Sequence, residues 1–181
     1  LHHLFGWQGA PLLGEQPEDV RPRDELRKDW PHHYTAQWSE LRTGLPHQRP
    51  MTIAGTIRTR RISSVLFRAG DRAVRFTMRD DKEGGWIGLD GRKALAVGCP
   101  KWLFVAWVVV GTEHRIWLGD GREDLASAPA PRGEIRGSDL REMSVIDLAS
   151  LIVWPRALEP RELALVFERE RYRMERRGIE L

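Results

Sequence analysis

The sequence has little cysteine, few lysines and no long apolar run, and these shortages exclude several classes of protein. The one cysteine, Cys99, excludes an internal disulfide framework and a four-thiolate zinc site within one chain. The longest apolar run, Trp102 to Val110, has nine residues, about half of what a membrane-spanning helix needs. No basic segment followed by an apolar one opens the chain, so we expect no signal peptide. With 41% hydrophobic residues among 181, the chain can still build the core of one domain.

The basic charge consists almost entirely of arginine: of 29 basic residues, 25 are Arg and four are Lys, for a net charge of +3. These arginines are interleaved with Asp and Glu along the chain. A nucleic-acid-binding protein concentrates its positive charge on one face, so we expect no nucleic-acid partner. The densest charged stretch, residues 168–177, alternates in sign and predicts a solvated helix with many ion pairs.

The first 49 residues differ from the rest of the chain. Residues 1–50 hold six of the 11 prolines and five of the six histidines, and they show no long periodic pattern. They also carry many large apolar side chains, too many for a free linker. We therefore predict an irregular N-terminal arm over residues 1–49, which docks on its own domain or on another protein subunit. The second case implies an oligomer or a larger assembly.

From residue 50 onward the hydrophobic pattern has a period of two, which is typical of half-buried β-strands. The segment from Trp102 to Val110 is apolar at even- and odd-numbered positions alike, which predicts a central strand covered on both faces. The Asp90-Gly91 pair predicts a type I′ hairpin, and the Pro- and Ala-rich segment from Ala126 to Gly137 predicts a loop. The remaining predicted strands are Met51 to Arg58, Ser63 to Ala69, Val74 to Arg79, Trp86 to Leu89, Lys93 to Val97, Glu113 to Leu118 and Val145 to Trp154.

Short strands separated by frequent turns predict an all-β fold, an antiparallel β-sandwich over residues 50–158. A charged helix and tail should follow over residues 159–181. Pro160 suits the first position of that helix, because its missing N–H would have no partner there. Its apolar stripe is Leu163, Val166, Phe167 and Met174.

Three segments in the same order resemble the concanavalin A-like lectin/glucanase superfamily, in its laminin-G-like branch. Residues 50–70, PMTIAGTIRTRRISSVLFRAG, resemble the opening pair of strands of that family. Residues 101–123, KWLFVAWVVVGTEHRIWLGDGRE, resemble its central hairpin. Residues 146–163, IDLASLIVWPRALEPREL, resemble its closing strand and helix. The resemblance covers about residues 50–170 and implies a jelly roll of two stacked antiparallel sheets.

Relatives in this superfamily include lectins, adhesion modules, virion or cell-surface accessory domains and glycoside hydrolases. The hydrolases carry their two carboxyl groups on one strand, spaced Glu-x-Asp-x-Glu or Glu-x-Asp-x-x-Glu, and no such run occurs here. We therefore expect no enzyme. The first hypothesis is a non-catalytic module that binds a glycan or surface polysaccharide. The alternative is a structural subunit of a bacteriophage-like virion, assembled through residues 1–49, and the third hypothesis is a glycoside hydrolase.

Tryptophan, with eight residues, is the strongest compositional signal for a sugar ligand, because indole rings stack on the apolar faces of sugars. Trp102, Trp107 and Trp154 lie in strongly apolar strands and are predicted to be core. Trp86 and Trp117 lie beside turns and are the predicted exposed platforms. The predicted ligand-binding set is Trp86, Asp90, Arg92, Arg115, Trp117, Asp120 and Arg122.

No cofactor or metal site is predicted from the residues. Calcium occurs in the laminin-G-like family, and Asp80, Asp81, Asp90 and Asp120 lie in loops that offer carboxylate ligands, so the resemblance leaves a calcium site open. The resemblance and the glycan hypothesis together imply an extracellular, cell-surface or virion location.

Overall fold

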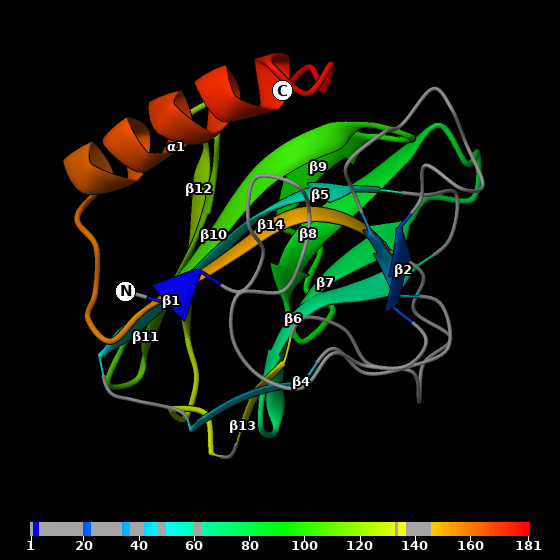
Figure 1. Cartoon of the computed structure of the whole chain (residues 1–181). Helices are drawn as coiled ribbons and strands as arrows, with labels where there is room; N and C mark the ends of the chain where they lie inside the picture. Colours follow the sequence, from blue (N-terminus) through cyan, green and yellow to red (C-terminus); the bar gives the residue numbers. More distant parts are fainter. Residues whose placement is uncertain are drawn as a thin grey trace.

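Two antiparallel sheets stack face to face in this protein, and helix α1 (Pro160–Glu175) lies across the outer face of one of them (Figure 1). The structure is a computed structural model that describes residues 2–3, 20–22, 34–36, 42–46, 50–59, 63–132, 134–136 and 146–181. The predicted antiparallel sandwich with a C-terminal helix is confirmed.

Within the described residues the first sheet has eight strands, and α1 covers it. At the centre of this sheet, β5 pairs with β10 on one side and with β14 on the other, although these three strands are far apart in the sequence. In spatial order the strands are β12 (Glu123–Ser127), β11 (Glu113–Leu118), β10 (Trp102–Val110), β5 (Met51–Arg58), β14 (Ile146–Trp154), β3 (Tyr34–Ala36) and β2 (Val20–Pro22), with β1 (His2–His3) paired to β14.

The second sheet has six strands in the part of the chain that the structure describes, and most of it follows the chain order. The strands from β6 to β9 form an antiparallel meander joined by turns. In spatial order they are β4 (Arg42–Pro46), β13 (Glu134–Arg136), β6 (Ser64–Ala69), β7 (Arg72–Met78), β8 (Gly84–Leu89) and β9 (Leu95–Gly98).

The described strands of the first 49 residues pair within this same chain. Strands β1 and β3 pair with β14, β2 pairs with β3, and β4 pairs with β13. The N-terminal region therefore adds strands to both sheets of its own sandwich. The remaining residues of the predicted arm lie outside the described part of the chain.

Strand β10 shows how the sandwich positions the rest of the molecule. Its odd-numbered side chains, among them Val105 and Trp107, enter the core between the two sheets. Its even-numbered side chains, among them Phe104 and Val108, pack beneath α1. Both faces of the strand are therefore buried, as its unbroken apolar run predicts.

The predicted hairpin at Asp90-Gly91 has the type I′ conformation. Both residues have positive φ, 49° for Asp90 and 85° for Gly91, and the N–H of Arg92 donates to the carbonyl of Leu89 over 2.9 Å. Two consecutive left-handed residues match the twist of the flanking strands, and Asp and Gly adopt that conformation most readily.

Helix α1 begins at Pro160, as predicted, and buries its apolar stripe against the first sheet. The expectation of a solvated helix with ion pairs applies to Glu168 and Arg171. Glu170 forms the expected kind of ion pair, with Arg173, but the expectation that it is solvated is wrong, because it is 2% exposed. Arg177, beyond the helix, is also buried, at 3% exposed. Arg177 donates to the carbonyl of Ala149 over 3.0 Å, because this end of the helix packs against β14. No described helix is long and apolar enough to cross a membrane.

Candidate functional site

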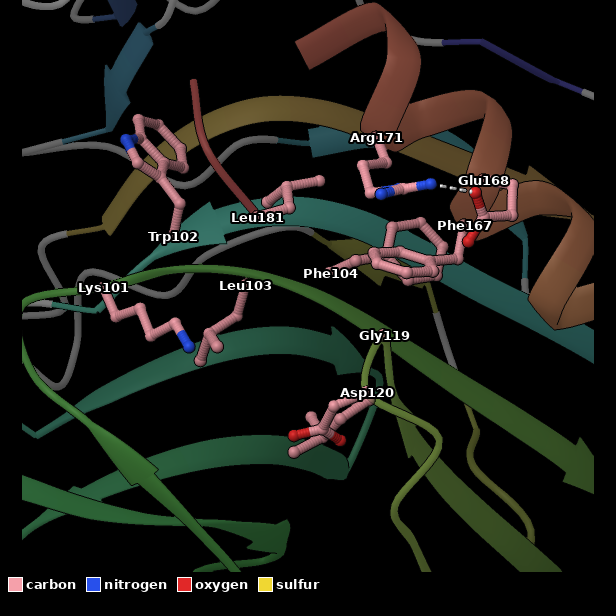
Figure 2. A pocket seen from close by; sticks show the side chains of 11 residues that line it. Lys101, Trp102, Leu103, Phe104, Gly119, Asp120, Phe167, Glu168, Arg171 and Leu181 are labelled. Atoms are coloured by element: carbon pink, nitrogen blue, oxygen red, sulfur yellow. Dashed lines mark hydrogen bonds and ion pairs between the residues drawn. The ribbon is translucent and has the colours of Figure 1, made fainter. Parts of the chain in front are cut away.

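A pocket of about 330 Å³ opens between helix α1 and the first sheet, where β10 begins and β11 ends (Figure 2). Four separate parts of the chain build it: the start of β10, the end of β11 with the turn after it, the middle of α1, and the C-terminal residue Leu181. Its lining residues are Lys101, Trp102, Leu103, Phe104, Leu118, Gly119, Asp120, Phe167, Glu168, Arg171 and Leu181.

One wall of the pocket is aromatic. The rings of Phe104 and Phe167 lie 5.8 Å apart, and the buried indole of Trp117 meets both edge-on, at 6.0 Å and 6.2 Å. Gly119 makes room for this arrangement, because a Cβ there would lie 2.5 Å from the Phe167 ring. Phe104 is 2% exposed, so the aromatic face that the pocket offers is the half-buried Phe167 ring, fixed by this ring packing.

The rim of the pocket is charged. Arg171 pairs with Glu168 over 2.6 Å, and Asp120 pairs with Arg122 over 2.6 Å. Partial burial raises the pKa of Asp120, but the hydrogen bonds from the guanidinium and backbone N–H of Arg122 outweigh it and bring the pKa below its usual value. Asp120 is therefore ionised at neutral pH, and both carboxylates are engaged by arginine side chains.

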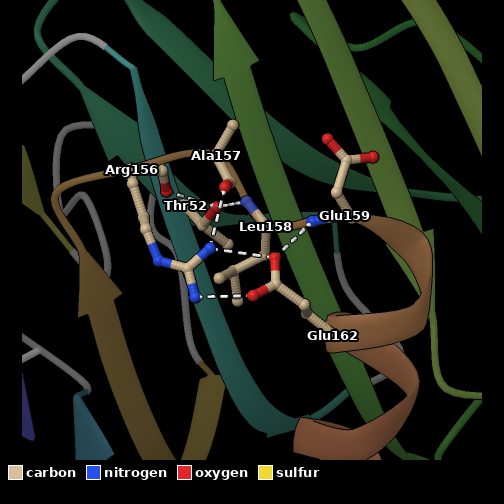
Figure 3. Close-up of polar contacts among 6 residues, drawn as sticks. All are labelled: Thr52, Arg156, Ala157, Leu158, Glu159 and Glu162. Atoms are coloured by element: carbon tan, nitrogen blue, oxygen red, sulfur yellow. Dashed lines mark hydrogen bonds and ion pairs between the residues drawn. The ribbon is translucent and has the colours of Figure 1, made fainter.

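Helix α1, which supplies one side of the pocket, is anchored at its start (Figure 3). The buried hydroxyl of Thr52 donates to the carbonyl of Arg156 over 2.9 Å and accepts the N–H of Leu158 over 3.0 Å. Glu162 binds the Arg156 guanidinium with both oxygens, at 2.7 and 2.9 Å, and also accepts the N–H of Glu159. These contacts tie the helix start to β5 and hold the pocket wall in position.

The predicted ligand-binding residues lie mostly near the edge where β12 of the first sheet faces β9 of the second. The five charged ones each form an ion pair within the protein. Surface ion pairs of this kind contribute little stability, but they occupy the groups that a ligand would need. The pairs are Arg72–Asp90 at 2.7 Å, Arg92–Asp124 at 3.1 Å, Arg115–Glu123 at 3.4 Å and Asp120–Arg122 at 2.6 Å.

Two of these arginines link the two sheets. Arg122 donates to the carbonyl of Ala96 on β9 over 2.6 Å, and Arg92 donates to the carbonyl of Leu125 on β12 over 3.2 Å. Each hydrogen bond joins the edge strand of one sheet to a loop or turn that belongs to the other sheet. Arg92 and Arg122 therefore have a structural task, and their role in ligand binding stays a prediction.

The prediction that Trp117 is exposed is wrong. Trp117 is 5% exposed, because α1 crosses the face of β11 onto which its side chain points. Trp86 is half-buried on the outer face of the second sheet, with the Lys93 ammonium 4.7 Å from its ring centroid. Of the two predicted platforms, only Trp86 offers an accessible indole.

Of the predicted set, only Asp120 lines the pocket. Sequence reasoning missed three pocket residues: Lys101, Phe104 and Arg171. Phe104 lies in a core strand, Lys101 directly precedes that strand, and Arg171 belongs to a charged helix. Phe167 had a signal, its place on the apolar stripe of the helix, but that signal indicated core packing. No periodic pattern connects these positions, because they meet only when α1 folds back over β10.

No group of three or more His, Cys, Asp or Glu side chains in the described residues is arranged to hold a metal ion. Of the four aspartates named for calcium, Asp81 pairs with Arg79, Asp90 with Arg72, and Asp120 with Arg122. The carboxylates of these three therefore have cationic partners already.

Comparison with known proteins identifies the fold. No protein-family model matches the sequence, and no curated protein matches it. Solved structures do match: Trypanosoma rangeli sialidase in complex with sialic acid has a TM-score of 0.53 at 12% identity, over 76% of this chain and 27% of that one. The binding domain of botulinum neurotoxin serotype D has a TM-score of 0.52 at 6% identity, over 84% of this chain and 45% of that one.

The fold is the concanavalin A-like jelly roll. The fold implied by the resemblance of residues 50–70, 101–123 and 146–163 is thereby confirmed. At these identities the concanavalin A-like matches establish the fold alone. The chain spans less than half the length of the matched sialidase and toxin chains.

Proposed function

We propose that this protein is a non-catalytic recognition module that binds a glycan in the pocket between α1 and β10. The observation that carries the proposal is the pairing of the half-buried Phe167 ring, backed by the buried Phe104, with four charged lining residues. These are Lys101, Asp120, Glu168 and Arg171. A sugar ring has apolar C–H faces and polar hydroxyl edges, so it needs both kinds of surface in one site. The volume of about 330 Å³ suits one or two sugar units.

The fold supports the same class of ligand. Concanavalin A-like domains include carbohydrate-binding domains, and one of the matched sialidase structures is a complex with sialic acid. Similarity of fold does not by itself specify a ligand, so the proposal rests on the pocket.

A binding role is favoured over hydrolysis by the state of the pocket carboxylates. A glycosidase needs one carboxyl group that is protonated at working pH and one that is free to attack or to activate water. Asp120 has a lowered pKa, and both of its oxygens accept hydrogen bonds from Arg122. Glu168 is paired with Arg171. Asp120 is therefore not prepared to act as a general acid.

The proposed module would act outside the cell or at its surface, where glycans and surface polysaccharides are found. Assembly with other subunits through residues 1–49 is the weaker alternative, since β1, β3 and β4 from that range pair with strands of this same chain.

A glycan array followed by titration tests the proposal. Wild type should bind at least one class of oligosaccharide, and Gly119→Ala should weaken that binding about tenfold, since its new Cβ displaces the Phe167 ring. The matched control is Gly98→Ala, because a Cβ there meets nothing within 4 Å. Binding unchanged in Gly119→Ala but lost in Trp86→Ala would move the site to the second sheet, and no binding to any oligosaccharide would reject the function.

A further inference from the structure

Helix α1 carries two large apolar side chains on the face that points away from the sandwich. Leu165 is 69% exposed and Tyr172 is 61% exposed. They are seven residues apart, or two helical turns, so they lie on the same side of the helix. The opposite side carries Leu163 and Met174, which are buried against the first sheet. Two of the four large hydrophobic side chains that the described residues expose therefore lie together on this helix.

Arginines continue the same row at spacings of three or four residues. The row, which we call the outer strip, consists of Arg161, Leu165, Arg169, Tyr172 and Arg176. All five residues are exposed, and none of them is acidic. The side chains of Arg161 and Arg169 form no hydrogen bond or ion pair with a described residue. The Arg176 guanidinium lies 5.9 Å from the centroid of the Tyr172 ring.

The four glutamates of α1 leave the arginines of the outer strip without a counter-charge, because each has another arginine as its neighbour. The pairs are Glu162–Arg156 at 2.7 Å, Glu168–Arg171 at 2.6 Å, Glu170–Arg173 at 2.5 Å and Glu175–Arg171 at 4.0 Å. The outer strip thus combines positive charge with exposed apolar surface. That combination is typical of helices that lie in the surface of an anionic membrane.

The shape of this face favours a flat partner. Helix α1 lies outermost on the first sheet (Figure 1), and its outer strip is a ridge. A helix of 16 residues is about 24 Å long and about 10 Å wide, which gives well under half of the roughly 800 Å² that each partner of a stable protein complex buries. A second copy of this chain would set arginines against arginines. A bilayer surface can contact the ridge along its whole length.

We infer that the outer strip binds the surface of a bilayer that contains anionic phospholipids. The lipid phosphates bind the three guanidinium groups, and Leu165 and Tyr172 reach the boundary between headgroups and acyl chains. The helix lies in the plane of the surface, and the short strip makes the binding reversible. This inference goes beyond glycan binding and does not depend on the pocket.

Co-sedimentation with lipid vesicles tests the inference. Wild type should bind vesicles of equimolar phosphatidylcholine and phosphatidylglycerol at least about tenfold more tightly than vesicles of phosphatidylcholine alone. Added salt should narrow the difference, because it screens the charges. Equal binding to the two kinds of vesicle, or binding to neither, would overturn the inference.

Paired variants locate the charge that the bilayer recognises. Arg161→Gln combined with Arg169→Gln should weaken binding to the mixed vesicles about tenfold or more. The matched control combines Lys82→Gln with Lys93→Gln, which removes the same charge from exposed positions near the second sheet. The control should bind like wild type. Equal losses in the two double variants would show that net charge alone drives the binding, and the outer strip would be rejected as the site.

A second pair tests the apolar contact. Leu165→Ala should weaken vesicle binding about tenfold, whereas Leu125→Ala, which changes a leucine that is 60% exposed on β12, should have no effect. Both side chains are largely exposed, so both variants should fold like wild type, as urea unfolding can verify. Soluble polyglutamate is the competing ligand. If it binds as tightly as the vesicles and Leu165→Ala has no effect on vesicle binding, the partner is an acidic polymer and not a bilayer. Gly119→Ala, in the pocket, should leave vesicle binding unchanged, so this result and that of the glycan test are independent.

Discussion

The indole Nε1–H of Trp107 donates a hydrogen bond to Nδ1 of His114 over 3.2 Å in the interior of the sandwich. The two rings stack, with centroids 5.9 Å apart and 23° between their planes. An indole nitrogen can only donate, so Nδ1 is the acceptor and the ring proton is on Nε2. Nε2 lies 3.2 Å from the carbonyl of Ala128, to which it donates. The neutral imidazole thus has a partner at each nitrogen.

This pair predicts a loss of stability in mild acid. Burial lowers the pKa of His114 below 6.5, and the carbonyls of Ala128 and Pro129 oppose that shift without reversing it. The nearest charges, Asp90 and Arg72, act in opposite directions. A second ring proton would face the Trp107 donor, so the folded state resists protonation. Unfolded chains bind that proton more readily, and stability should therefore fall as the pH drops below about 6.5.

Urea unfolding at pH 7.5 and pH 5.0 measures this effect, with tryptophan fluorescence as the signal. The wild type should lose free energy of unfolding between the two pH values, and His114→Gln should lose less. The other five histidines lie within residues 2–47 and are shared by both proteins, so they cancel in the comparison. An identical pH dependence in the two proteins would contradict the prediction.

Thr52→Val should destabilise the protein by about 1–3 kcal/mol, since it removes the hydroxyl that serves both the Arg156 carbonyl and the Leu158 N–H. Thr56 is the matched control: it lies on the same strand and is also fully buried, but its hydroxyl oxygen has no hydrogen-bond partner among the described residues. Thr56→Val should therefore be neutral or stabilising. Chemical denaturation of the two variants checks the prediction, and equal losses would contradict it.

Glu162→Gln should lower stability at neutral pH and have no effect in strong acid. The Arg156 guanidinium and the Glu159 backbone N–H hold the pKa of Glu162 at about 2, against 4.5 for an unperturbed Glu. A carboxylate with a lowered pKa stabilises the fold above pH 4.5, and this contribution is lost as the pH falls through about 2. Thermal midpoints of both proteins between pH 7 and pH 2 should converge. A constant gap would show that charge is not what Glu162 contributes.

Trp117→Ala should cost about 3–5 kcal/mol, the usual range for removing a buried aromatic ring. Its indole contacts Phe104 and Phe167, so this variant should also loosen α1 over the first sheet. Trp86→Ala serves as the comparison, because Trp86 is half-buried on an outer sheet face and its loss should cost much less. Urea unfolding gives both values. A larger loss for Trp86→Ala would place the more important packing on the second sheet.

The strands and turns that depend on local pattern were predictable. The nine apolar residues of β10, the Asp90-Gly91 turn and the Pro160 helix start all occur where the sequence indicates them. Strands β12 and β13 were missed, and both overlap the segment from Ala126 to Gly137 that was predicted as a loop. Strand β12 is a polar edge strand whose one partner among the described strands is β11. It is therefore identified by its backbone pairing and not by its side-chain pattern.

The neighbouring residues Ile116 and Trp117 show which structural features the sequence determines and which depend on the tertiary structure. Their opposite faces follow from the period of two along a strand, which any chain in that conformation obeys. Whether the Trp117 face meets water or α1 depends on a helix some 45 residues further along, which no local pattern reports. The sequence by itself determined the sandwich, its turns and the charged helix. The tertiary structure decided which charges pair with one another and which side chains line the pocket, because both depend on contacts between segments far apart in the chain.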